Sequence, residues 1–130
     1  MKTNPPKVKR ATRGPQRPAE DFKELLRVDV DWSSTGIWAI KEPGARYAGV
    51  NMSYDSLPIS EELIKRFERW TEWHDLSDTR NSYHQADWDL HSKYAWSLAI
   101  DLKRELGEDY YVEFRGREIH DDIKFLKYEE

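Results

Sequence analysis

Residues 24–40 read ELLRVDVDWSSTGIWAI, two hydrophobic runs separated by a short polar turn. In the first run hydrophobic residues alternate with charged ones, and this period of two is typical of a strand with one buried face. That strand is expected over about 24–32, and its buried face would hold Leu26, Val28, Val30 and Trp32. The turn contains Gly36, which can adopt positive φ without strain. Since the second run follows after only four residues, the stretch predicts an antiparallel hairpin.

Two amphipathic helices are predicted after this hairpin. Ser60 is the candidate N-cap of the first, and the two glutamates that follow it suit the positive end of the helix dipole. The apolar stripe of this helix is Leu63, Ile64, Phe67, Trp70 and His74, and the helix is expected to end near 74–75. The second helix is expected to start near Asp87 and to end before Gly107. Its stripe is Tyr94, Ala95, Leu98, Leu102 and Leu106.

Strands are predicted on both sides of the helical region. Residues 110–114 (YYVEF) predict a strand, residues 47–52 a short third strand, and residues 119–126 one more short element. The order β-β-(β)-α-α-β-(β) predicts an α+β fold, a small antiparallel sheet covered on one face by two helices. The other face of the sheet would carry Arg27, Asp29 and Asp31, and we expect it to be open to solvent or to a partner.

The charge of the chain is divided unevenly. Residues 1–18 contain six basic residues and no acidic one, whereas residues 19–130 contain 15 basic and 25 acidic residues, a net charge of −10. The first segment is rich in proline and poor in large apolar residues, so it is predicted to be a disordered basic tail. Residues 19–130 are predicted to form a single acidic domain.

Composition excludes several classes of protein. The chain has no cysteine, which excludes disulfides, thiolate catalysis and cysteine-based metal sites. No apolar run approaches the ~18–20 residues that a transmembrane helix needs. No secretory signal is evident either, so a cytoplasmic location is expected.

No motif for catalysis, nucleotide binding or metal binding is found, so we expect a non-enzymatic protein without a cofactor or metal. His74, His84 and His91 lie in one stretch, but no two of them have the i, i+4 spacing of a helical metal site. Asp29 and Asp31 would share one strand face, where general acid–base catalysis would need one of them desolvated. The open face expected there favours ordinary solvated charges.

Three sequence blocks resemble those of a group of small bacterial proteins of uncharacterised function. They are Asp31-Trp32-Ser33-Ser34 with Ile37-Trp38, then Leu57-Pro58-Ile59-Ser60-Glu61-Glu62-Leu63 with Arg66-Phe67, Trp70, Trp73 and Asp75, and finally Leu98-Ala99, Leu102-Lys103, Glu105-Leu106-Gly107, Tyr110 and Val112-Glu113-Phe114. The likeness covers about 28–114 and implies a single α+β domain, with no activity to transfer. The size, the acidity and the absence of catalytic motifs also look like the immunity proteins of bacterial toxin systems, an analogy of type rather than of motif.

Aromatic residues are the most unusual feature, with six Trp and seven Tyr. Several lie outside the predicted stripes and beside acidic residues. They either pack around the rim of the core or form a recognition surface, because Trp and Tyr dominate interface hot spots. The candidate partner-binding residues are Trp73, Asp75, Asp78, Tyr83, Asp87, Trp88, Asp89 and Trp96.

These observations predict a protein-binding module of the immunity or antitoxin type. Its acidic, aromatic surface would bind and neutralise a basic protein such as a toxin or nuclease. The alternative is a nucleic-acid-associated protein that binds through the basic tail. The residues of that alternative site are Lys7, Lys9, Arg10, Arg13 and Arg17. The charge of −10 on the predicted domain opposes this alternative, because it would repel phosphates.

Overall fold

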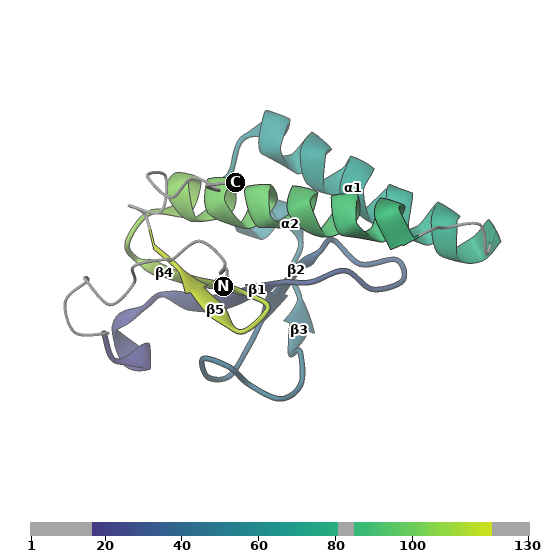
Figure 1. Cartoon of the computed structure of the whole chain (residues 1–130). Helices are drawn as coiled ribbons and strands as arrows, with labels where there is room; N and C mark the ends of the chain where they lie inside the picture. Colours follow the sequence, from purple (N-terminus) through teal and green to yellow (C-terminus); the bar gives the residue numbers. More distant parts are fainter. Residues whose placement is uncertain (1–16, 81–84, 121–130) are drawn as a thin grey trace, which may run out of the picture.

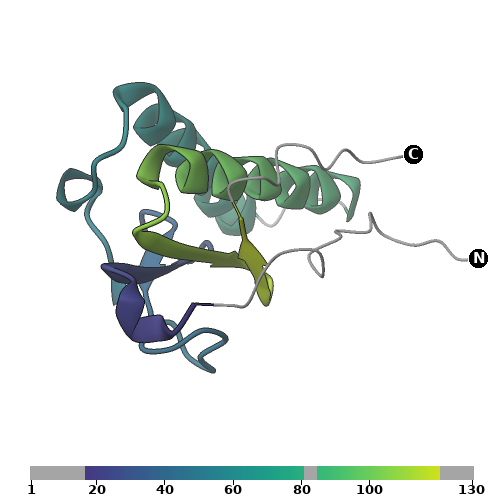
Figure 2. The same ribbon diagram turned by 90° about the vertical axis from the view of Figure 1, so that its left-hand side faces the viewer.

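The computed structural model describes residues 17–80 and 85–120, which form a five-stranded sheet and two long helices (Figure 1). The strands are β1 (Glu24–Val28), β2 (Ile37–Ala39), β3 (Val50–Asn51), β4 (Tyr110–Phe114) and β5 (Arg117–Ile119). The helices are α1 (Glu61–Arg80) and α2 (Gln85–Leu106), and single 3₁₀ turns cover Ala19–Asp21 and Tyr54–Ser56. Figure 2, turned by 90°, also shows α1 and α2 side by side over one face of the sheet. The predicted α+β fold is confirmed.

The strand order is β3-β2-β1-β4-β5, and the sheet is mostly antiparallel. β1 and β2 form the predicted hairpin, in which Val28 lies opposite Ile37. The central pair, β1 and β4, is parallel, with Leu26 opposite Val112. A parallel pair needs a long crossover connection, and here that connection contains both helices.

The main core lies between the helices and the sheet. Each of its central side chains is at most 2% exposed. They are Leu26 and Val28 on β1, Leu63, Phe67 and Trp70 on α1, and Ala95, Leu98 and Leu102 on α2. Full burial of one such large side chain contributes roughly 1.5–3 kcal/mol, so the helix stripes and the facing strand residues together stabilise the contact between the layers.

The first helix begins at the predicted cap. The Leu63 backbone N–H donates to Ser60 Oγ at 3.1 Å, which satisfies one of the free amides of the first turn. Ser60 also donates from its backbone N and its Oγ to the two carboxylate oxygens of Glu105, at 2.7 and 2.8 Å. The start of α1 is thereby tied to the end of α2. Gly107 follows α2 with φ 83°, as its predicted C′ role requires.

Two predicted boundaries were wrong. β1 ends at Val28, because residues 31–34 form a turn in which Ser33 has φ 58°. The Ser33 backbone N–H donates to Asp75 of α1 and not to a neighbouring strand. Trp32 is therefore 51% exposed and does not belong to the core. α1 continues beyond 75 to Arg80, since residues 75–90 contain no glycine or proline that would end a helix. The part of the last predicted element at 123–126 lies outside the described residues.

The second face of the sheet is covered in part, whereas the sequence predicted an open face; Asp29 and Asp31 are exposed as expected, but Arg27 is partly buried. Leu25, Ile40 and Tyr111 are buried there against Phe22 and Ala45 and make a second, smaller core. The segments that precede β1 and follow β2 cover the part of this face that carries Leu25, Ile40 and Tyr111. Within the described ranges, neither helix is long and apolar enough to cross a membrane.

Candidate partner-binding surface

Three segments distant in sequence meet at the end of the molecule where α1 ends and α2 begins. They are residues 31–33 of the β1–β2 turn, 74–76 of α1 and 88–90 of α2. The ring of His74 links them, because its centroid lies 5.9 Å from that of Trp32 and 5.8 Å from that of Trp88. We call these three segments the helix-end surface.

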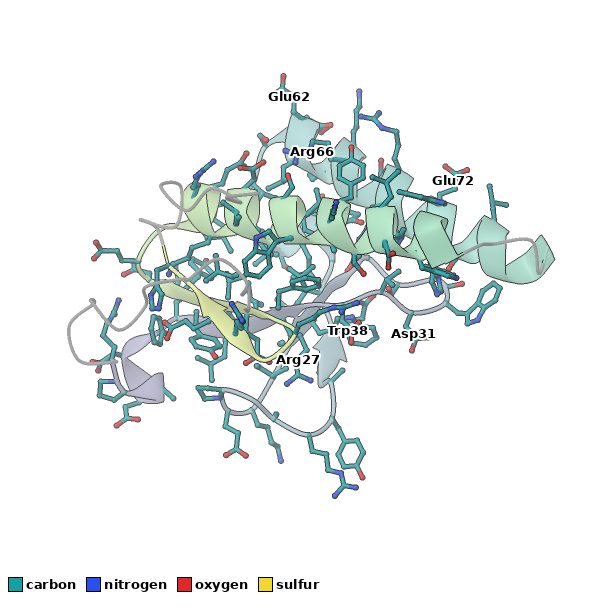
Figure 3. All side chains as sticks on the ribbon, viewed as in Figure 1. Arg27, Asp31, Trp38, Glu62, Arg66 and Glu72 are labelled. Atoms are coloured by element: carbon teal, nitrogen blue, oxygen red, sulfur yellow. The ribbon has the colours of Figure 1, made fainter. Side chains whose placement is uncertain are left out.

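Each segment of the helix-end surface places an aspartate directly before a large exposed hydrophobic residue. The pairs are Asp31-Trp32, Asp75-Leu76 and Asp89-Leu90. Trp32, Leu76 and Leu90 are 51%, 46% and 57% exposed. The three segments contain no lysine or arginine. The three segments thus combine exposed apolar side chains with carboxylates, and Figure 3 shows Asp31 projecting from the β1–β2 turn.

Asp75 holds two of these segments together. Its Oδ2 accepts a hydrogen bond from the Ser33 backbone N–H at 3.1 Å, and its Oδ1 lies 2.8 Å from His74 Nδ1. The β1–β2 turn is therefore fixed against α1 before any partner binds. A pre-organised surface loses less conformational freedom on association, which favours affinity.

A buried histidine supports the surface from below. Burial lowers the pKa of His91, which favours the neutral imidazole. The His91 ring is contacted edge-on by Trp73 at 4.7 Å and by Trp88 at 5.3 Å between centroids. The position of Trp88 at the helix-end surface therefore depends on His91.

The structure brings together some of the predicted partner-binding residues and separates others. Trp73, Asp75, Trp88 and Asp89 lie at or directly beneath the helix-end surface. Trp96 lies eight residues beyond Trp88 on α2, about 12 Å along the helix axis. Its ring packs on Phe114 of β4, 5.7 Å away. Asp78 and Asp87 lie in α1 and α2, but their side chains are outside the described part of the chain, and Tyr83 is outside the described residues altogether.

Sequence reasoning missed Trp32, Leu76 and Leu90. The alternation that places Trp32 on the buried face continues past the real end of β1, so the pattern was misleading there. The run Asp31-Trp32-Ser33-Ser34 could have indicated the turn, because Asp and Ser favour turns. A residue between them is then not expected to continue a regular strand.

A polar network centred on Glu113 lies on the sheet face that the helices do not cover. The Glu113 carboxylate, 2% exposed, accepts from Arg27 Nε at 2.7 Å, from the Gly44 backbone N–H at 2.8 Å and from the Tyr111 hydroxyl at 2.9 Å. Arg27 Nη2 also donates to the Ala45 carbonyl at 2.5 Å. Burial, followed by the charge of Glu113, raises the pKa of Tyr111, so this hydroxyl stays protonated. The network fixes the segment between β2 and β3 against the sheet.

Most of the basic residues of the alternative nucleic-acid site lie outside the described residues. They are Lys7, Lys9, Arg10 and Arg13. Arg17 is described, and it packs on the domain. Its guanidinium donates to the carbonyl groups of Glu108 and Asp21, at 2.5 and 3.0 Å, and lies 4.4 Å from the Phe22 ring centroid. Arg17 is thus engaged with the chain itself.

The histidine stretch does not form a metal site among the described residues, where no three His, Asp or Glu side chains are placed to hold an ion. His74 contacts Asp75, and His91 contacts the Trp70 carbonyl. His84 is outside the described ranges.

Comparison with known proteins identifies the family. The family model described as "Serratia CdiI immunity protein-like" matches residues 24–117, from the first residue of β1 to the first residue of β5. No curated protein matches the chain. The match covers most of the chain, includes the whole helix-end surface and supports the immunity-type resemblance seen in the sequence. The chain belongs to the Serratia CdiI immunity protein-like family.

Proposed function

We propose that the chain is an immunity protein that binds and neutralises a basic toxin through its helix-end surface. Membership of an immunity protein family supports the general role. The observation that carries the choice of surface is the threefold pairing of an aspartate with an exposed hydrophobic residue, at Trp32, Leu76 and Leu90.

This composition suits capture of a cationic protein. An exposed tryptophan such as Trp32 is a frequent source of binding energy at an interface, and neighbouring apolar residues such as Leu76 and Leu90 help to exclude water. The aspartates around them attract positive charge and disfavour acidic competitors. The net charge of −10 on residues 19–130 adds a longer-range attraction that speeds encounter with a basic partner.

The test is protection of growing bacteria. A candidate basic toxin, sought among the genes beside that of this chain, is induced in cells that also express the chain, and growth is followed. We expect the parent chain to restore growth and Trp32→Ala to lose most of the protection at equal expression. Tyr47→Ala is the matched control, because Tyr47 is 73% exposed but lies on the segment between β2 and β3.

Two results would overturn the proposal. The first is full protection by a triple variant in which Trp32, Leu76 and Leu90 are all replaced by alanine. The second is loss of function on deletion of residues 1–16 together with co-purifying DNA or RNA, which would favour the basic tail as the binding site.

A further inference from the structure

A crevice lies at the carboxyl ends of the parallel strands β1 and β4. After Val28 the chain turns toward β2 on one side of this pair, and after Phe114 it turns toward β5 on the other side. Connections that diverge from adjacent parallel strands leave a gap between them, and such gaps are the usual ligand sites of sheets with parallel strands. Here the gap is a cavity of about 370 Å³, whose lining includes Trp70 and His91 of the helical pair.

Four charged side chains line this crevice, and three of them are already engaged. Arg27 and Glu113 form the buried ion pair described above. Arg115 Nη2 donates to Ser92 Oγ at 2.8 Å, and its guanidinium lies 5.6 Å from the Phe114 ring centroid. Asp29 remains.

Asp29 has little to balance its charge. Its Oδ1 accepts from the Val30 backbone N–H at 3.0 Å, and no salt bridge joins it to another described residue. Asp29 is an exposed residue of the crevice lining, yet partial burial of its carboxyl group raises the pKa of Asp29, and the nearby carboxylate of Asp31 acts in the same direction. The Val30 hydrogen bond, Arg27 and Arg115 oppose this rise, but neither arginine reaches ion-pair distance of Asp29.

We propose that this crevice receives a lysine or arginine side chain of the toxin, with Asp29 as its carboxylate partner. The inference rests on the proposed function and adds a specificity pocket beside the helix-end surface. The entering cation replaces the weak attraction of Arg115 for Asp29 with a direct, charge-assisted hydrogen bond. The aliphatic stem of the entering side chain packs on the apolar part of the lining.

The test uses small probes and does not require the toxin. N-acetyl-arginine amide is titrated into the ¹⁵N-labelled full chain and compared with its neutral isostere, N-acetyl-citrulline amide. We expect the arginine probe to shift the amide signals of Asp29, Ser92 and Gly116. Asp29→Asn keeps the acceptor for Val30 and should weaken this binding about fivefold, the upper end for loss of an exposed ion pair.

Two further variants keep the outcome decisive. Arg115→Gln removes the competing internal cation and should strengthen binding of the arginine probe. Asp109→Asn, an exposed residue before the amino end of β4, is the matched control and should change nothing. Equal binding of the arginine and citrulline probes, or the absence of shifts at the crevice, overturns the proposal.

The toxin assay separates this inference from the proposed function. If Trp32→Ala abolishes protection while Asp29→Asn leaves toxin affinity unchanged, the crevice is not the pocket and the helix-end surface stands. If the triple alanine variant of the helix-end surface still protects fully, the proposed function fails whatever the probes bind.

Discussion

Trp70 and His91 exchange a pair of hydrogen bonds across the contact between α1 and α2. The Trp70 Nε1–H donates to the His91 carbonyl at 3.2 Å, and His91 Nε2 donates to the Trp70 carbonyl at 3.1 Å. The two rings are stacked, with centroids 5.0 Å apart. Because a carbonyl can only accept, Nε2 carries the proton of the neutral imidazole. This reciprocal pair fixes the two helices beneath the helix-end surface.

The free energy of unfolding is expected to fall with pH below about 6.5, the ordinary pKa of histidine. Burial lowers the pKa of His91 in the folded state, so the unfolded state binds a proton first as the pH falls. The stabilisation is therefore complete above the unfolded pKa and is lost as the pH falls toward the folded one. Urea unfolding, followed by Trp fluorescence between pH 7.5 and 5, measures this dependence.

His91→Gln is the variant that isolates this effect, since its amide can still donate to the Trp70 carbonyl. We expect it to be less stable than the parent chain at pH 7.5 and to approach the parent as the pH falls. His120→Gln is the control, because His120 lies beyond β5 at the edge of the sheet. A constant difference between His91→Gln and the parent across this range would show that His91 does not titrate on unfolding.

Arg27→Met is expected to destabilise the fold by roughly 3 kcal/mol. The substitution leaves the Glu113 carboxylate buried without its cation, although Gly44 and Tyr111 still donate to it. Breaking one side of a buried pair costs about 3–5 kcal/mol in such cases. Arg27 is 15% exposed on its side chain, which places the expected value at the lower end.

A double variant, Arg27→Met with Glu113→Gln, is expected to recover part of this loss, because no uncompensated charge remains. Denaturant unfolding of the parent, both single variants and the double variant gives the coupling free energy. Strict additivity of the two single effects would mean that the ion pair contributes nothing beyond its separate hydrogen bonds.

Much of the helical layer could be predicted from sequence, for physical reasons that are visible residue by residue. The stripe of Leu63, Phe67 and Trp70, the cap at Ser60 and the stop at Gly107 are local signals, and each is confirmed. The parallel pairing of β1 with β4 was not evident, because strands separated by two helices carry no local mark of their register. The burial of Glu113 was missed because its partners, Arg27 and Gly44, are distant in sequence.

The candidate site was predicted in part for the same reasons. Trp88 and Asp89 were found because an aromatic residue beside an acid off the core stripe is a local pattern. Trp32 was misplaced, since only the three-dimensional turn at Ser33, held by Asp75, removes it from the core. Whether these residues bind a partner remains a prediction.

Trp96→Ala is expected to lower stability by roughly 2–3 kcal/mol with little effect on partner binding. The sequence makes Trp96 a candidate partner-binding residue. Its packing on Phe114 now indicates that it stabilises the contact between α2 and β4. Removing a large, partly buried aromatic side chain costs somewhat less than the 3–5 kcal/mol of a fully buried one.

Trp32→Ala provides the contrast, because Trp32 is half exposed. This substitution should lower the free energy of unfolding by roughly 1 kcal/mol or less. Thermal unfolding of the two variants is compared with their affinity for the toxin. A stable Trp96→Ala that no longer binds the toxin would return Trp96 to the interface and enlarge the binding surface along α2.

The association rate with the toxin is expected to depend strongly on salt. If the helix-end surface and the charge of −10 steer a basic partner, raising the salt from 50 to 500 mM should slow association about tenfold or more, because the Debye length shortens over this range. Dissociation should change much less, since it is governed by contacts already formed. Stopped-flow mixing monitored by Trp fluorescence separates the two rates.

Asp31→Asn and Asp89→Asn test which carboxylates produce the steering. Both residues are exposed at the helix-end surface, so each substitution should lower the association rate while leaving the fold intact. Glu62→Gln is the matched control, because Glu62 lies in the first turn of α1, at the other end of that helix from the surface (Figure 3). Equal slowing by all three variants would attribute the steering to the total charge of the domain, whereas slowing confined to the first two locates it at the surface that carries Trp32.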